Sequence, residues 1–266
     1  MAFHMREATE ADIPSLCDVF FDAFSEDPIS SRVFPRSSAH AQAEIQDTFT
    51  HSVAEPDVHI FVVTEEPASD SAVDQKNAIL GYVEWVAPRS EPYSPPPPAP
   101  STDGKKAEAL AQQFFEVMER KQREHMANQP HWHLAFIGVR HRAQGRGVAR
   151  QLIQWGIEKA DEEGMEAYVQ SSPMAASRYR RYGFEDIETH HFDLAGDYHE
   201  VFMKRKPQQK QPRLPSSKEP KAIPEEAPTG TDSLKTSQLF STIGSAREGK
   251  SLNRFDHSLN AIAQVG

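Results

Sequence analysis

The sequence has a single cysteine, no long apolar run and no excess of basic residues. Because Cys17 stands alone, no intrachain disulfide can form; this excludes a disulfide-stapled secreted scaffold and favours a reducing compartment. No stretch approaches the roughly 20 consecutive apolar residues of a membrane span, and no basic segment followed by an apolar one opens the chain. We therefore expect a cytoplasmic protein, with the nucleus as the alternative, and no membrane partner.

Positive charge is also scarce: 39 acidic residues face 29 basic ones, which gives a net charge of -10. A surface that neutralises nucleic-acid phosphates needs clustered Lys and Arg, so we expect no nucleic-acid partner. An acidic cleft, in contrast, concentrates cationic ligands such as amines. The length of 266 residues predicts one domain of ordinary size with appendages, as a monomer or a homodimer.

Two segments have a composition unsuited to a packed core. Residues 87–100 carry seven prolines, which remove backbone donors, so we predict a Pro-rich insertion at 88–104 followed by a helix over 105–126. Beyond Lys206 the chain turns to Pro, Ser, Lys, Glu and Gln, which predicts a disordered tail over 207–266. The remaining 3–206 form the predicted domain.

Within this domain, segments whose apolar residues have the spacing of a strand are interleaved with segments that have the spacing of a helix. The predicted order is strand, helix, strand, strand, helix, strand, helix, strand, helix, strand, strand, which is an α/β (α+β) domain. Thr9 and Asp12 resemble a capping box at the start of the first helix. Val58–Thr64 and Ile79–Val86 predict paired strands.

The richest stretch runs from Trp132 to Phe184. An apolar strand, 132–139, leads into a polar turn, 140–149, that opens a helix. Two glycines in the turn let the backbone approach a ligand, and free N–H groups at a helix start favour phosphate. Arg146 and Arg150 add positive charge there. The spacing excludes a P-loop, which needs Gly-Lys-Ser/Thr, and a dinucleotide fingerprint, which needs a small residue at position 150.

Two motifs in this stretch carry a family resemblance. The pattern Gln/Arg-x-x-Gly-x-Gly/Ala is matched by Gln144, Gly147 and Ala149, and a strand is followed by a helix ending in Tyr-x-x-x-Gly-Phe at 179–184. The chain thereby resembles the GNAT N-acetyltransferase superfamily over about 3–206, and among its members fungal GNAT-domain acetyltransferases and puromycin N-acetyltransferase-like enzymes. The resemblance implies a mixed, mostly antiparallel sheet flanked by helices, acetyl-CoA as cosubstrate and no metal.

The resemblance also implies roles for single residues. Backbone groups of Ile137 and Val139 would bind the pantetheine arm, and Ser172 stands where relatives have a pantetheine-contacting asparagine. Tyr179 stands where relatives have a tyrosine that protonates the departing thiolate. The main chain of the turn would hold the pyrophosphate through Gln144, Gly145, Arg146, Gly147, Val148 and Ala149.

For the general base the sequence leaves alternatives open. His133 occupies the position on the central strand where some relatives place a carboxylate, and its ordinary pKa suits a base near neutral pH. Glu84 on the preceding strand is the second candidate, as base or substrate anchor. A base acting through water is the third. Both residues are equally compatible with a structural role.

The acceptor site is expected at the first helix and its loop, 24–34, together with Glu84, Trp85 and the strand pair after Phe184. Phe24, Asp27, Phe34 and Trp85 would enclose an aromatic or hydrophobic amine. Adjacent histidines at 190–191 point to opposite faces of a strand, so no metal site is predicted.

The expected reaction is direct acetyl transfer from acetyl-CoA to a primary amine, with a small-molecule amine as the favoured partner. Backbone N–H groups would polarise the thioester carbonyl, and Cys17 would have no nucleophilic role. The alternatives are a protein or peptide N-acetyltransferase and a non-catalytic acyl-CoA sensor.

Overall fold

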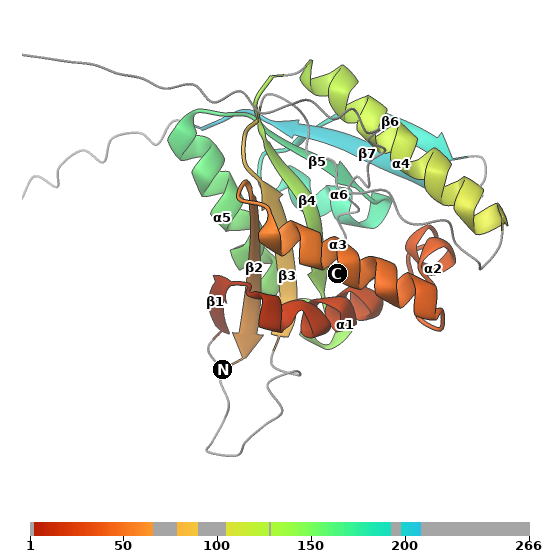
Figure 1. The fold of residues 1–266 in the computed structure, drawn as a ribbon. Coiled ribbons are helices and arrows are strands. Elements are labelled where there is room, and N and C mark those ends of the chain that lie inside the picture. The colour runs from red at the N-terminus through yellow and green to blue at the C-terminus, as the bar shows by residue number, and fades with distance from the viewer. Residues whose placement is uncertain (1–2, 66–78, 90–104, 128, 193–197, 209–266) are drawn as a thin grey trace, which may run out of the picture. The chain divides into compact units, whose positions relative to one another are not determined.

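The structure is a computed structural model that describes residues 3–65, 79–89, 105–127, 129–192 and 198–208 (Figure 1). Most of the predicted Pro-rich insertion and nearly all of the predicted disordered tail lie outside these residues.

Seven strands form one sheet in the order β1-β2-β3-β4-β5-β7-β6. Every neighbouring pair is antiparallel except β4 and β5, which are parallel. The strands are β1 Phe3–Glu7, β2 Val58–Glu65, β3 Ile79–Val86, β4 Trp132–Val139, β5 Ala167–Ser171, β6 Glu185–Phe192 and β7 Tyr198–Arg205. The helices are α1 Ile13–Ala23, α2 Ser30–Val33, α3 Ala39–Ala54, α4 Lys105–Met126, α5 Val148–Glu163 and α6 Pro173–Arg180. This mixed, mostly antiparallel sheet confirms the predicted fold class.

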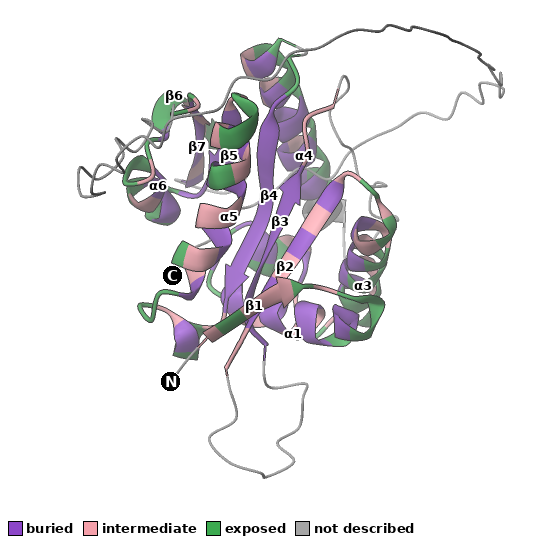
Figure 2. Cartoon of the chain, turned by 90° about the vertical axis from the view of Figure 1, so that its left-hand side faces the viewer, coloured by how far each residue is buried: buried purple, intermediate pink, exposed green. Residues whose placement is uncertain are grey.

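Helices cover both faces of the sheet. Apolar residues of α1, α3 and α4 pack in one cluster on one face, and those of α5 and α6 pack in a second cluster on the other. Figure 2 shows the central strands β3 and β4 buried along their whole length between these layers. Strands buried on both faces read as continuous apolar runs, which is why both were recognisable in the sequence. None of the helices in the described ranges is long and apolar enough to cross a bilayer.

The predicted capping box is confirmed. The backbone N–H and the hydroxyl of Thr9 donate to Asp12 at 2.8 and 3.0 Å, and the turn continues into α1. Arg6 of β1 also donates to both oxygens of Asp12, at 2.7 and 2.8 Å. This bidentate pair, with help from Thr9, lowers the pKa of Asp12 to about 2. The first strand is thereby joined to the start of the first helix.

The segment between β1 and β2 differs from the prediction of a single helix. It also contains the short α2 and the 16-residue α3. The hydroxyl of Ser38 accepts from the N–H of Ala41, which caps α3. Only Ala41, Ile45, Phe49 and Ser52 of α3 are buried. This apolar stripe is too narrow to have stood out from the polar background.

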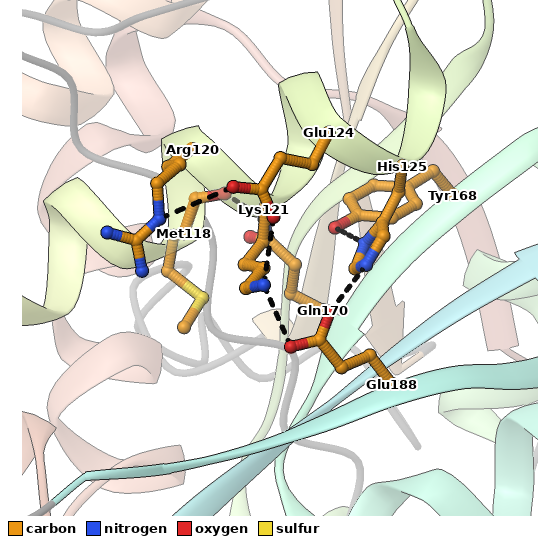
Figure 3. Close-up of polar contacts among 8 residues, drawn as sticks. All are labelled: Met118, Arg120, Lys121, Glu124, His125, Tyr168, Gln170 and Glu188. Carbon is orange, nitrogen blue, oxygen red and sulfur yellow. Dashed lines mark hydrogen bonds and ion pairs between the residues drawn. The ribbon is translucent and has the colours of Figure 1, made fainter.

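Helix α4 is attached to the sheet by charged groups as well as by its apolar face. Figure 3 shows Glu188 of β6 reaching both Lys121 and His125 of α4. Lys121 Nζ and His125 Nε2 lie 2.8 and 2.9 Å from its two oxygens. His125 Nδ1 also lies 3.3 Å from the Tyr168 hydroxyl, and Gln170 Nε2 donates to the Met118 carbonyl at 2.9 Å. The helix is thus fixed across β5 and β6.

Candidate active site

The parallel strands β4 and β5 pair only along part of their length. Their register runs from Trp132 opposite Ala167 to Leu134 opposite Val169 and ends there. Ala135 is an extra residue in β4 at that point, since Glu84 and Trp85 of β3 face Phe136 and Leu134. A bulge bends its strand and breaks the ladder. Beyond it, β4 continues with β3, whereas β5 continues with β7, and the two strands diverge (Figure 1).

The divergence leaves backbone groups of β4 without a partner strand. In an antiparallel pair, residues alternate between bonding to their neighbour and pointing away from it. The N–H of Arg140 donates to the Leu80 carbonyl of β3 at 2.8 Å. The alternate residues Ile137 and Val139 therefore direct their N–H and C=O groups toward the β5 side. These are the two residues whose backbone the family resemblance assigns to the pantetheine arm.

The turn after β4 fits a phosphate group. Gly145 and Gly147 have φ angles of 73° and 91°, and a Cβ on either would meet no heavy atom within 4 Å. Left-handed backbone favours glycine, and the open space allows a ligand to approach the main chain. Gly147 begins α5, whose first N–H groups have no intrahelical acceptor. A cavity of about 310 Å³ opens here, lined by Val139, Gln144, Gly145, Gly147, Val148 and Ala149 among others.

The positive charge at this first cavity comes from α6 and the turn after it. Arg178 and Arg181 line the cavity, and Nη1 of Arg178 is buried with no hydrogen-bond partner among the described residues. The Arg146 side chain instead pairs with Glu65 and lies over the Phe3 ring at 5.1 Å. Only the main chain of Arg146 belongs to the predicted phosphate turn. The sequence motif indicated Arg146 and Arg150 as the source of positive charge and gave no signal for Arg178 and Arg181.

A second cavity of about 200 Å³ adjoins the first, because Gln144 lines both. Its charged and titratable lining consists of Glu26, Asp27, His141 and Tyr198. The predicted pantetheine residue Ser172 also lines it, with its hydroxyl buried and unpartnered within the described part of the chain. One cavity is therefore basic and the other predominantly acidic.

Tyr179 lies in α6 and is fully buried against the Phe184 ring, with centroids 5.7 Å apart. Its hydroxyl has no hydrogen-bond partner among the described residues, and it is not in the lining of either cavity. Burial, and then the charge of Glu200, raise the pKa of Tyr179 well above 10. The phenol therefore stays protonated at neutral pH, as a proton donor must. Its predicted role as acid stays a prediction.

His133 lies beneath α4. Its Nδ1 is 3.4 Å from Gln122 Nε2, and its ring lies 6.3 Å from that of His131. Burial, and then the charge of His131, lower the pKa of His133 to about 3, so the ring is neutral at pH 7. Neither cavity includes it. The structure thus does not bring this base candidate to the acceptor cavity.

Glu84 is also buried, on the face of the sheet covered by α1 and α3. Burial raises its pKa to about 7, partly offset by a hydrogen bond with Ser52 of α3. This value would suit a general base. However, Glu84 lines neither cavity, and its Oε2 has no hydrogen-bond partner in the residues described. Its role as a base also stays a prediction.

Of the predicted acceptor residues, only Asp27 lines the second cavity. Phe24 and Phe34 pack in the core with Phe20. Trp85 lies on the opposite face, where its Nε1 donates to the Leu152 carbonyl at 3.2 Å. Burial raises the pKa of Cys17 to about 11, so this thiol is protonated at neutral pH. In the described ranges, no three His, Cys, Asp or Glu side chains gather as a metal-binding group.

Comparisons with known proteins agree with this architecture. A family model described as an acetyltransferase (GNAT) domain matches residues 110–196. Putative arylalkylamine N-acetyltransferase 7 from the yellow fever mosquito Aedes aegypti has a similar fold, with 13% identity and a TM-score of 0.55 over 77% of this chain and 87% of that one. The "histone acetyltransferase HPA2 and related acetyltransferase" structure from Corynebacterium glutamicum is 22% identical, with a TM-score of 0.49 over 80% and 100% of the two chains.

The family match assigns residues 110–196 to a GNAT acetyltransferase domain, and the fold of the described residues agrees with it. The domain match supports an acetyl-CoA-dependent N-acetyltransferase. The glycine turn, the unpaired edge of β4 and the unpartnered Arg178 fit the pyrophosphate and pantetheine of this cosubstrate. The nearer likeness to fungal and puromycin N-acetyltransferase-like enzymes is untested by these matches and stays a prediction.

Proposed function

We propose that the acceptor is the primary amine of a small molecule. The observation that carries this proposal is the acidic cavity that adjoins the basic one through Gln144. Phosphates of CoA are attracted to Arg178 and Arg181, while a protonated amine is attracted to Glu26 and Asp27. The second cavity measures about 200 Å³, which suits a compact group better than a folded protein surface.

In the proposed reaction, the amine attacks the thioester carbonyl directly, in a ternary complex. Backbone N–H groups of β4 orient the thioester, and holding both reactants in place supplies much of the rate. Tyr179 gives a proton to the departing thiolate. The first alternative, protein acetylation, would be favoured by an exposed groove that accepts a peptide. The second, a non-catalytic sensor, would be favoured by CoA binding without turnover.

The test is an assay of thiol release from acetyl-CoA across a panel of acceptors. The panel contains arylalkylamines, a polyamine, an aminoglycoside and peptides with a free N-terminus, alongside calorimetric measurement of CoA binding. We expect turnover with at least one small amine and none with the peptides. Turnover with peptides alone, or CoA binding without any turnover, would overturn the proposal.

Tyr179→Phe provides a second test of the same reaction. Removing the hydroxyl should lower kcat by about 100-fold, within the usual contribution of a general acid. The Kd for CoA should change by less than about twofold, because the buried ring is kept. Tyr182→Phe is the matched control, since Tyr182 lies on the first cavity without the proposed acid role. Equal losses of kcat in Tyr179→Phe and Tyr182→Phe would contradict the assignment of Tyr179 as the acid.

A further inference from the structure

Three buried oxygen groups meet at the wall of the acceptor cavity. The Tyr198 hydroxyl of β7 donates to Glu200 Oε1 in a very short contact, and it lies 3.4 Å from Asp27 Oδ2. The exposed fractions of Asp27, Tyr198 and Glu200 are 1%, 6% and 0%. Asp27 and Tyr198 line the cavity, whereas Glu200 lies behind Tyr198.

Asp27 is held in one orientation by the backbone. Its Oδ1 accepts from the N–H of Ile29 at 3.1 Å and of Ser30 at 2.7 Å, at the start of α2. Backbone N–H donors favour the ionised form of a carboxyl group. Oδ2 is the oxygen turned toward Tyr198, which lines the same cavity. The carboxylate is thus fixed through one oxygen, and the other contacts Tyr198.

Glu200 has the opposite environment. Burial raises its pKa well above the usual value, the Asp27 charge raises it further, and the Tyr198 hydrogen bond opposes both. Its Oε2 is buried without a hydrogen-bond partner among the described residues. Burial therefore favours the protonated form of Glu200, whereas the two backbone donors favour the ionised form of Asp27, which lines the cavity.

Resting on the proposed function, we infer that Asp27 is the base that takes the proton of the acceptor ammonium. Tyr198 and Glu200 are positioning residues: the Tyr198 hydroxyl contacts Oδ2 of Asp27, and Glu200 holds that hydroxyl in place. The inference assigns the base to the second cavity, away from His133 and Glu84. It also means that the acceptor amine binds in its protonated, cationic form.

The proton balance of the step is complete. The ammonium gives one proton to Asp27, and the neutral amine then attacks the thioester carbonyl, so that a C–N bond forms and the C–S bond breaks. The sulfur leaves with the bonding electron pair and takes a proton from Tyr179. Tyr179 recovers a proton from the acylated nitrogen, and Asp27 releases its own to water. One acetamide, one CoA thiol and one proton result.

The titratable groups around this site come from several elements. Glu26 and His141 share the cavity with Asp27 and Tyr198, and His141 Nδ1 lies 3.6 Å from Asp22 Oδ2. Burial raises the pKa of Tyr179, and the Glu200 carboxyl raises it further whenever that carboxyl is ionised. Loss of the Glu200 carboxyl should therefore change the pH dependence of the reaction and not only its rate.

The kinetic test compares Asp27→Asn, Glu200→Gln and Glu26→Gln, using the best amine of the panel. Asp27→Asn should lower kcat by at least about 100-fold and abolish the acid limb of the kcat–pH profile. Glu200→Gln should lower kcat by about tenfold and shift that limb to lower pH by about one unit, because the competing carboxyl is removed. Glu26→Gln should raise KM by several-fold and leave the limb in place. His133→Gln or Glu84→Gln removing the limb, with Asp27→Asn retaining it, would overturn the inference.

A binding test measures the effect of the Asp27 charge on amine affinity and needs no turnover. Its result is therefore independent of whether the proposed acetyl transfer is observed. Calorimetry on the CoA complex compares phenethylamine with 2-phenylethanol, which has nearly the same shape and no charge. The wild-type protein should prefer the amine by at least about tenfold, and Asp27→Asn should lose the preference. Equal binding of both probes, or binding of neither, would contradict the inference. Circular dichroism checks that each variant is folded.

Discussion

Gly156 of α5 lies against the indole of Trp85 of β3, so that a Cβ built on the glycine would be 2.1 Å from ring atom Cε2. The contact is the closest that any glycine substitution in the described residues would create against a side chain. Trp85 is fully buried and is also held by its hydrogen bond to Leu152. Helix α5, which follows the phosphate turn, can therefore pack this close to the sheet only because residue 156 has no side chain.

Gly156→Ala should accordingly destabilise the protein. Alanine favours a helix over glycine by roughly 1 kcal/mol, but forcing Trp85 to move should cost more than this gain, for a net loss of about 1–3 kcal/mol. Urea unfolding would measure it. Gln154→Ala on the same helix is the control and should lie within about 0.5 kcal/mol of wild type. A stabilised Gly156→Ala variant would show that the indole adjusts without strain.

Much of the fold was accessible from the sequence because its signals are local. Thr9 and Asp12 form their capping box within one turn, and the buried strands β3 and β4 are continuous apolar runs. Helix α3 was missed because its buried residues are spread among polar ones. Its signal was Ser38 as a cap, followed by apolar residues at a spacing of four.

The candidate site was less predictable, since its charges depend on contacts between distant segments. Arg146 turned to Glu65, 81 positions away, so its place in the motif did not reveal its partner. Tyr198 meets Asp27 across 171 positions. A local signal for Glu200 did exist: with Tyr198 and Phe202 it shares one face of a strand, where two large apolar neighbours predict burial.

The role of the turn in binding phosphate can be tested with the two glycines that flank α5. Gly147 begins α5 and Gly164 ends it, with φ angles of 91° and 67°, and a Cβ would meet nothing within 4 Å at either position. Both alanine variants should lose about 1 kcal/mol of stability from left-handed backbone. Only Gly147→Ala should weaken CoA binding, by at least about tenfold, measured by calorimetry. Equal affinities in the two variants would refute the assigned turn.

The arginines should differ in their effect on CoA affinity. Arg178→Ala removes a guanidinium that faces the first cavity with a buried, unpartnered Nη1. A charge-assisted hydrogen bond contributes roughly 1.5–3 kcal/mol, so the Kd for CoA should rise by about tenfold or more. Arg146→Ala, whose side chain is engaged with Glu65, should change the Kd by less than about threefold. A larger effect of Arg146→Ala would mean that its side chain turns to the phosphates on binding.

Glu188 should contribute to holding α4 on the sheet. Glu188→Gln weakens its contacts with Lys121 and His125, and partly exposed ion pairs contribute up to about 1 kcal/mol. Faster amide exchange is expected along α4 (Figure 3). Glu124→Gln is the control, because Glu124 pairs only within α4, with Arg120 and Lys121 in the described contacts. Equal exchange in the two variants would show that apolar packing alone retains the helix.

The buried carboxyl of Glu84 should make stability depend on pH. Its pKa rises from the ordinary glutamate value of 4.5 to about 7 in the fold, so the folded protein binds this proton more tightly than the unfolded chain. The associated stability is fully present below pH 4.5 and is lost as pH rises through 7. Glu84→Gln abolishes the titration while an amide can keep the contact with Ser52.

The variant should therefore match wild type near pH 4.5 and become more stable than it by up to about 3 kcal/mol at pH 8, from the pKa difference. Thermal unfolding followed at several pH values measures this difference, and other titrating groups such as Glu200 cancel because both proteins contain them. Glu158→Gln, a substitution of an exposed carboxylate on α5, should give a flat difference curve. A flat curve for Glu84→Gln as well would mean that Glu84 keeps its ordinary pKa and is reached by water.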